Sequence, residues 1–76
     1  MIELEEDFKI RAYTKVELAG MYNPGMTITG ALRTLARWIS GNKSLTAELS
    51  LLEYNHRNRI YTPRQVRAIA EHLGEP

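Results

Sequence analysis

The sequence predicts a mainly α-helical domain of about four helices with a minimal β element. Four segments repeat their apolar residues with the period of an α-helix, and each follows a serine or threonine that can cap a helix. Only two short stretches have the pattern of strands. With 76 residues the chain has room for one domain, which we place at residues 8–76, after an acidic tail at residues 1–7.

The first predicted element is a short, half-buried strand at residues 8–13. Phe8, Ile10 and Ala12 alternate there with Lys9, Arg11 and Tyr13, and a period of two is typical of a strand with one buried face. Lysine and arginine on the outer face suit an edge strand, where charge discourages pairing with other chains. We therefore expect Phe8, Ile10 and Ala12 to face the core.

The first helix is predicted at residues 15–22. Thr14 and Glu17 have the spacing of a capping box, in which each side chain accepts a hydrogen bond from the other residue's backbone amide. Asn-Pro-Gly at residues 23–25 ends this helix, because proline disfavours helix before it and glycine allows a tight turn.

The second helix is predicted at residues 28–39, capped by Thr27 and ended by Gly41 and Asn42. Its apolar face comprises Ile28, Leu32, Leu35, Ala36 and Ile39. Trp38 flanks this face, and we expect it to lie in the core.

The third helix is predicted at residues 45–53, with Ser44 as its cap. It carries apolar residues on two sides: one side holds Leu45, Leu49 and Leu52, and the nearly opposite side holds Ala47, Leu51 and Tyr54. A helix that is apolar on two sides is either deeply buried or shared with another chain. In so small a domain we favour the second case, which makes Ala47, Leu51 and Tyr54 a candidate dimer interface.

A short strand at residues 59–61 and a last helix at residues 63–73 complete the prediction. Thr62 caps the helix, Pro63 occupies its first position and Gln65 completes a second capping box. Val66, Ile69, Ala70 and Leu73 form its apolar face, and Gly74 ends it.

Catalysis, metal binding and cofactor binding are not expected from these residues. The chain has no cysteine, its histidines His56 and His72 are far apart, and it lacks a phosphate-binding glycine loop. A small-molecule substrate is not expected either. The acidic N-terminus is unlike a secretory signal, and no apolar run approaches the ~20 residues of a membrane span. These features predict a soluble cytoplasmic protein without a membrane partner.

The distribution of charge points to duplex DNA as a partner. The net charge is +1, but residues 8–76 carry ten basic and five acidic residues, and residues 33–67 carry seven basic and two acidic residues. The first two predicted helices and their turn have the order of a helix-turn-helix, whose second helix enters the major groove. Its groove-facing residues would be Thr29, Arg33 and Arg37.

The basic loop at residues 55–59, with the short strand and Thr-capped helix after it, resembles the wing and following helix of the MerR and excisionase class of winged helices. This resemblance implies a winged helix-turn-helix fold in which Arg57 and Arg59 lie along the DNA backbone. The helix predicted before the wing departs from the simplest version of that class and fits a dimer contact instead.

Most of the chain after the acidic tail also resembles a family of short Bacteroidetes proteins known only as a domain of unknown function. The most specific matching segments are Thr-Pro-Arg-Gln-Val at residues 62–66 and Leu-Gly-Glu-Pro at residues 73–76. This resemblance implies a bacterial cytosolic domain and no particular activity. Two functions therefore remain open: a small DNA-binding protein, associated with transcription or mobile elements, and a homodimeric protein–protein interaction module that binds no nucleic acid.

Overall fold

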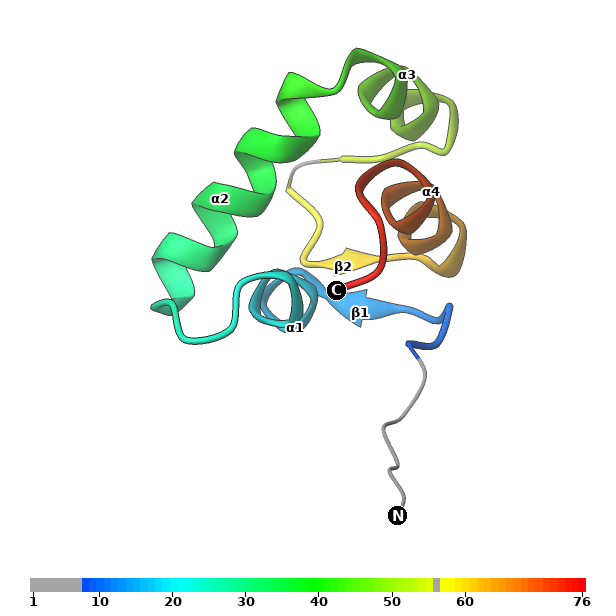
Figure 1. Cartoon of the computed structure of the whole chain (residues 1–76). Coiled ribbons are helices and arrows are strands. Elements are labelled where there is room, and N and C mark those ends of the chain that lie inside the picture. The colour runs from blue at the N-terminus through cyan, green and yellow to red at the C-terminus, as the bar shows by residue number, and fades with distance from the viewer. Residues whose placement is uncertain (1–7, 56) are drawn as a thin grey trace.

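Six elements follow one another along residues 8–55 and 57–76, which the computed structural model describes (Figure 1). In this part of the chain they are β1 Tyr13–Thr14, α1 Lys15–Tyr22, α2 Ile28–Gly41, α3 Lys43–Leu51, β2 Ile60–Tyr61 and α4 Pro63–Leu73. The prediction of a mainly α fold with a minimal β element is therefore confirmed. The predicted acidic tail at residues 1–7 lies outside the described residues.

The helices surround the two-stranded sheet, with α2 along one side of the molecule and α4 on the other (Figure 1). β1 and β2 pair antiparallel, Tyr13 opposite Tyr61 and Thr14 opposite Ile60. The largest fully buried side chains come from all four helices that the structure describes: Leu18, Leu35, Leu45, Leu49, Val66 and Ile69. The chain end after α4 returns beside α1, where the Tyr22 hydroxyl donates to the carbonyl oxygen of Gly74 at 2.5 Å.

Both predicted capping boxes are confirmed. At α1 the Thr14 hydroxyl oxygen accepts from the Glu17 amide at 3.0 Å, and a Glu17 carboxylate oxygen accepts from the Thr14 amide at 2.9 Å. The hydrogen bond from the Thr14 amide lowers the pKa of Glu17. Thr62 and Gln65 form the same pair at α4. These contacts lie within one helical turn, so neighbouring residues suffice to specify them.

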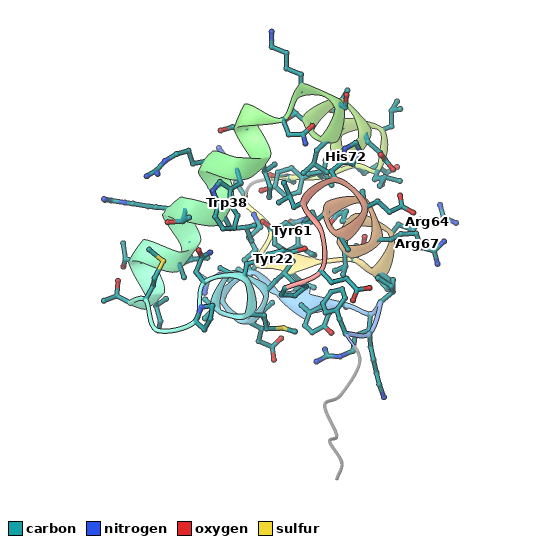
Figure 2. The ribbon with its side chains drawn as sticks, viewed as in Figure 1. Tyr22, Trp38, Tyr61, Arg64, Arg67 and His72 are labelled. Atoms are coloured by element: carbon teal, nitrogen blue, oxygen red, sulfur yellow. The ribbon has the colours of Figure 1, made fainter. Side chains whose placement is uncertain are left out.

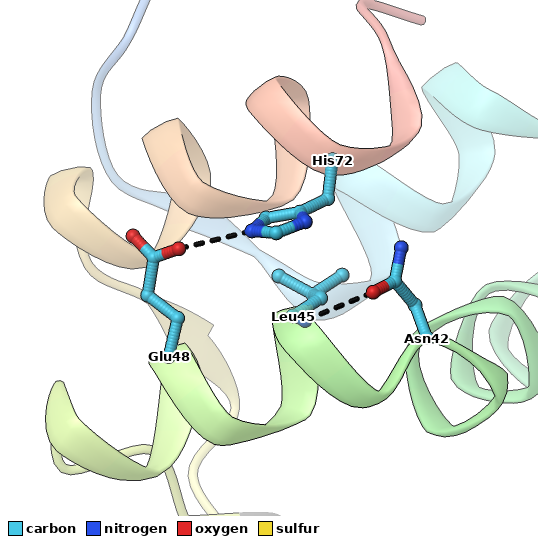
Figure 3. A network of polar contacts seen from close by, with 4 residues as sticks. All are labelled: Asn42, Leu45, Glu48 and His72. Carbon is cyan, nitrogen blue, oxygen red and sulfur yellow. Dashed lines mark hydrogen bonds and ion pairs between the residues drawn. The ribbon is translucent and has the colours of Figure 1, made fainter.

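The predicted start of α3 is wrong by two residues. Asn42, and not Ser44, caps this helix, because its side-chain oxygen accepts from the Leu45 amide at 2.9 Å (Figure 3). The backbone amide of Asn42 also donates to the Ile39 carbonyl oxygen at 3.1 Å. One asparagine thus ends α2 and begins α3, which fixes the angle between the two helices.

The predicted strand at residues 8–13 is also wrong, since β1 contains only Tyr13 and Thr14. Ile10 and Ala12 are exposed, whereas Tyr13 is buried. The Tyr13 hydroxyl donates to the Lys9 carbonyl oxygen at 2.8 Å, and its ring stacks on Phe8 with centroids 5.6 Å apart. The Tyr13 hydroxyl can reach a carbonyl oxygen four residues earlier only if the chain bends. This segment therefore packs its two aromatic rings together and does not form an extended strand.

α3 and α4 are joined by a polar contact across their surfaces. His72 Nε2 lies 3.0 Å from a carboxylate oxygen of Glu48 (Figure 3). Both side chains are partly exposed, so water competes with this contact and its contribution to stability is modest.

Candidate nucleic-acid interface

α1 and α2 pack against each other across a short, well-defined turn. The buried side chain of Asn23 donates to the Ala19 carbonyl oxygen at 3.3 Å, and its backbone amide donates to the same oxygen at 2.9 Å. Gly25 has φ of 86°, a conformation that favours glycine. The predicted turn therefore holds α2 in a defined orientation on α1.

The three residues predicted to face a DNA groove all lie exposed on α2. Thr29, Arg33 and Arg37 follow one another at four-residue intervals, so they share one face of the helix. Arg33 and Arg37 each stand two residues from the buried Leu35, which places them about 160° away from it around the helix axis. Their side chains therefore leave the helix on the side away from the core.

The loop with the other two predicted arginines lies beside this helix. Arg57 and Arg59 line a surface groove of about 470 Å³ together with Leu32 of α2 and residues 14–16 at the start of α1. The loop is held in place because the Arg59 carbonyl oxygen accepts from the Lys15 amide at 2.8 Å. Leu32 directly precedes Arg33, so their Cα atoms are only about 3.8 Å apart. The structure thus brings the loop against α2 at Leu32, one residue before Arg33.

The wing implied by the winged-helix resemblance is not seen in the described part of the chain. β2 pairs with β1, before α1, and no second strand lies between α3 and β2 among residues 52–55 and 57–59. His56, within the same loop, lies outside the described residues. Arg57 and Arg59 therefore sit on a loop anchored to α1 and not on a β-hairpin.

Two of the three residues predicted for a dimer interface share one exposed side of α3. Ala47 and Leu51 are exposed one turn apart on α3, and Leu51 is 83% exposed. Tyr54 does not join them, because α3 ends at Leu51 and the chain turns at Glu53, which has φ of 63°. The Tyr54 ring is half-buried on the inner side, stacked on Tyr61 with centroids 5.9 Å apart.

The ammonium group of Lys15 contacts this pair of tyrosines. Lys15 Nζ lies 3.1 Å from the Tyr54 hydroxyl and 4.7 Å from the centre of the Tyr54 ring. Burial raises the pKa of Tyr61, and the neighbouring Tyr54 raises it further. The Tyr61 phenol therefore stays neutral in the physiological range, and the cluster packs the start of α1 against β2.

The prediction that Trp38 lies in the core is wrong. Its side chain is 41% exposed, and its ring makes an edge contact with Tyr22 at 6.4 Å between centroids and 81° between planes. Leu35 and Ile39 already occupy the core-facing side of α2, so Trp38 lies at its boundary. Figure 2 shows Trp38 and Tyr22 beside each other between α2 and α1.

A second groove, which the sequence did not reveal, opens beside Trp38. It has a volume of about 540 Å³ and lies where α2 ends and α3 begins, lined by Arg37, Trp38, Gly41, Asn42, Lys43, Ser44 and Leu73. The sequence offered one signal, an apolar residue adjoining Arg37 at the edge of the buried face. Whether this edge of α2 is covered or open depends on how Tyr22 and α4 pack against it, which only the structure shows.

The fold and these surfaces define a small helical domain with a two-stranded sheet and a basic outer helix. The chain belongs to a family described as a domain of unknown function (DUF4248), whose model matches residues 9–76. The predicted likeness to a family known only in these terms is confirmed. No curated protein and no solved structure matches the chain. Among residues 8–55 and 57–76, no helix combines the length and apolar character needed to cross a membrane.

Proposed function

We propose that this protein binds duplex DNA through the outer face of α2 and the loop at residues 57–59. The observation that carries the proposal is that the loop with Arg57 and Arg59 lies against α2, the helix that carries Arg33 and Arg37. Arg33 and Arg37 project from α2, and Arg57 and Arg59 border a groove that also contains Leu32, the residue next to Arg33. Two basic segments that are distant in the sequence thus both involve α2, one as part of the helix and the other packed against it.

The charge around this interface favours a polyanion. No acidic residue occurs in residues 18–47 or 54–70, which together hold seven of the ten lysines and arginines. Arginines on such a surface neutralise phosphates and release counterions, which drives association with DNA.

The dimensions of α2 also suit this role. Its 14 residues make a helix about 21 Å long, and a B-DNA major groove about 12 Å wide admits one α-helix. Arginine can donate two hydrogen bonds to guanine, and threonine can contact bases or phosphates. Thr29, Arg33 and Arg37 would read the groove, while Arg57 and Arg59 would contact the backbone.

Replacing Arg57 and Arg59 by alanine is expected to weaken binding to all duplex sequences about equally. Each lost phosphate contact lowers the slope of log affinity against log salt by about 1, so the double variant should flatten it by about 2. The measurement is fluorescence anisotropy of a labelled random duplex between about 50 and 200 mM salt.

The matched control removes two arginines from another surface. Arg64 and Arg67 project from α4 on the side away from α2 (Figure 2), and the Arg64→Ala, Arg67→Ala variant has the same net charge as the first. If both double variants lost affinity equally, net charge and not this interface would drive binding. Failure of the wild type to bind at the lowest salt would refute the proposed function.

Homodimerisation through α3 is a second candidate function, which the exposure of Leu51 favours. A leucine that is 83% exposed contributes almost nothing to its own fold, and with Ala47 it would provide a small apolar contact for a second copy. Residues near a two-fold axis meet their own symmetry mates. One such surface would therefore suffice for a symmetric dimer.

Leu51→Glu is expected to convert such a dimer into a folded monomer, because it places two like charges close together at the contact. Sedimentation equilibrium measures the mass, and circular dichroism verifies the fold. The control is Ile60→Glu, which adds the same charge at an apolar residue of β2 that is 50% exposed. A dimer that persists in Leu51→Glu would exclude this surface, as would a wild-type monomer.

A further inference from the structure

We propose that the groove beside Trp38, at the junction of α2 and α3, binds an unpaired nucleotide of a single-stranded nucleic acid. In this site the base stacks on the Trp38 indole, and the flanking phosphates pair with Arg37 and Lys43. The inference goes beyond duplex binding and does not depend on it, because Trp38 and Lys43 are not part of the interface proposed above and only Arg37 belongs to both.

Trp38 is held as a fixed platform at the edge of the groove. On its inner side the indole makes the edge contact with Tyr22, and the Tyr22 hydroxyl is in turn bound to the Gly74 carbonyl oxygen. Burial, followed by the nearby Glu75 carboxylate, raises the pKa of Tyr22 to about 12, so this donor keeps its proton. On its other side the indole faces solvent, and Trp38 is 41% exposed. A partly exposed, braced indole is the kind of surface on which nucleic-acid bases stack.

The other lining residues complement a nucleotide in charge and in space. Arg37 and Lys43 are cationic, and among residues 8–55 and 57–76 no acidic residue lines the groove. A Cβ atom added at Gly41 would meet no other described segment of the chain within 4 Å, so that part of the groove is open. The groove is shallow and open to solvent, which leaves room for a base to lie on Trp38 beside the two cations. An aromatic platform flanked by cations selects an aromatic anion, and a nucleotide has both properties.

The single tryptophan of the chain reports directly on this site. Titration with a short oligothymidylate should quench Trp38 emission and saturate. An abasic strand of the same length keeps the phosphates but lacks the bases, so it should bind without quenching and about 5- to 100-fold more weakly. Equal affinity for the two strands, measured by competition, would overturn the proposal.

Gly41 allows the groove to be filled without removing the tryptophan. Gly41→Leu places a side chain in the open part of the groove, and it should weaken oligothymidylate binding and remove the quenching. Gly41→Ala is the matched control and should bind like the wild type, because its methyl group leaves most of the groove open. Identical binding by these two variants would refute the site.

Variants at the platform and at its cation supply independent readouts. Labelled oligothymidylate should bind Trp38→Leu about 5- to 100-fold more weakly and Trp38→Phe nearly as well as the wild type, because only phenylalanine retains a stacking surface. Lys43→Ala should lower the salt slope by about 0.7, the contribution of one phosphate on a single strand. If Trp38→Leu is unstable, the Gly41 and Lys43 variants still decide the question.

The outcomes separate this inference from the proposed duplex interface. Quenching by oligothymidylate without duplex binding would support the groove and refute the duplex interface. Duplex binding that requires Arg57 and Arg59, without quenching by single strands, would do the opposite. A change in Trp38 emission with protein concentration alone, abolished by Gly41→Leu, would identify the groove as a contact between copies and overturn the nucleotide assignment.

Discussion

Leu35→Ala is expected to reduce the free energy of unfolding by about 3–5 kcal/mol. Leu35 is 1% exposed at the middle of α2, on the face that packs into the core. Truncation removes most of a buried side chain and leaves a cavity that the surrounding helices fill only partly. A domain of this size has a total stability of about 4–11 kcal/mol, so the variant should lose a large share of it.

Urea unfolding followed by circular dichroism measures this loss, and Leu51→Ala provides a matched control. The control deletes the same atoms from a leucine that is 83% exposed in the single chain, so its effect on the stability of the monomer should stay within about 0.5 kcal/mol. Equal losses in the two variants would contradict the packing of α2 described above. A small effect of Leu51→Ala would also show that Leu51 contributes little to packing within its own chain.

Gln65→Met is the second large effect, with an expected loss of about 2–3 kcal/mol. Gln65 is 2% exposed and joins two parts of the chain. Its side-chain oxygen accepts from the Thr62 amide at 3.0 Å, and its side-chain nitrogen donates to the Leu52 carbonyl oxygen at 3.2 Å. Methionine has a similar size but cannot replace either bond. Each buried polar group left unpaired costs about 1–3 kcal/mol.

Glu17→Met removes the equivalent capping side chain of α1, at a position that is exposed to water. Glu17 occupies the corresponding place in the capping box of α1 but is exposed and has no second contact like that of Gln65 with Leu52. Water can replace its bond to the Thr14 amide, so the loss should be clearly smaller than for Gln65→Met. Thermal unfolding of the two variants gives the comparison. Equal losses would mean that the bond between Gln65 and Leu52 contributes nothing.

Some features of the candidate interfaces can be predicted from sequence, and others cannot. Thr29, Arg33 and Arg37 share a face of α2 because helical period alone dictates it. Tyr54 lies apart from Ala47 and Leu51 because it stacks on Tyr61, seven positions further on in β2. Trp38 fails as a core residue because Leu35 and Ile39 fill the space beneath α2, and Tyr22 takes the adjoining edge.

The sequence by itself determined the identity and order of the helices, two capping boxes and the separation of basic from acidic residues. These features depend on contacts within about four residues, which a linear pattern records. The tertiary structure alone decided which surfaces are open. The residue pairs that cover the remaining surfaces lie far apart in the chain. Tyr22 and Gly74 are separated by 52 residues, and Lys15 and Tyr54 by 39 residues. No local rule specifies such pairs, because they form only when the packed helices bring the two segments together.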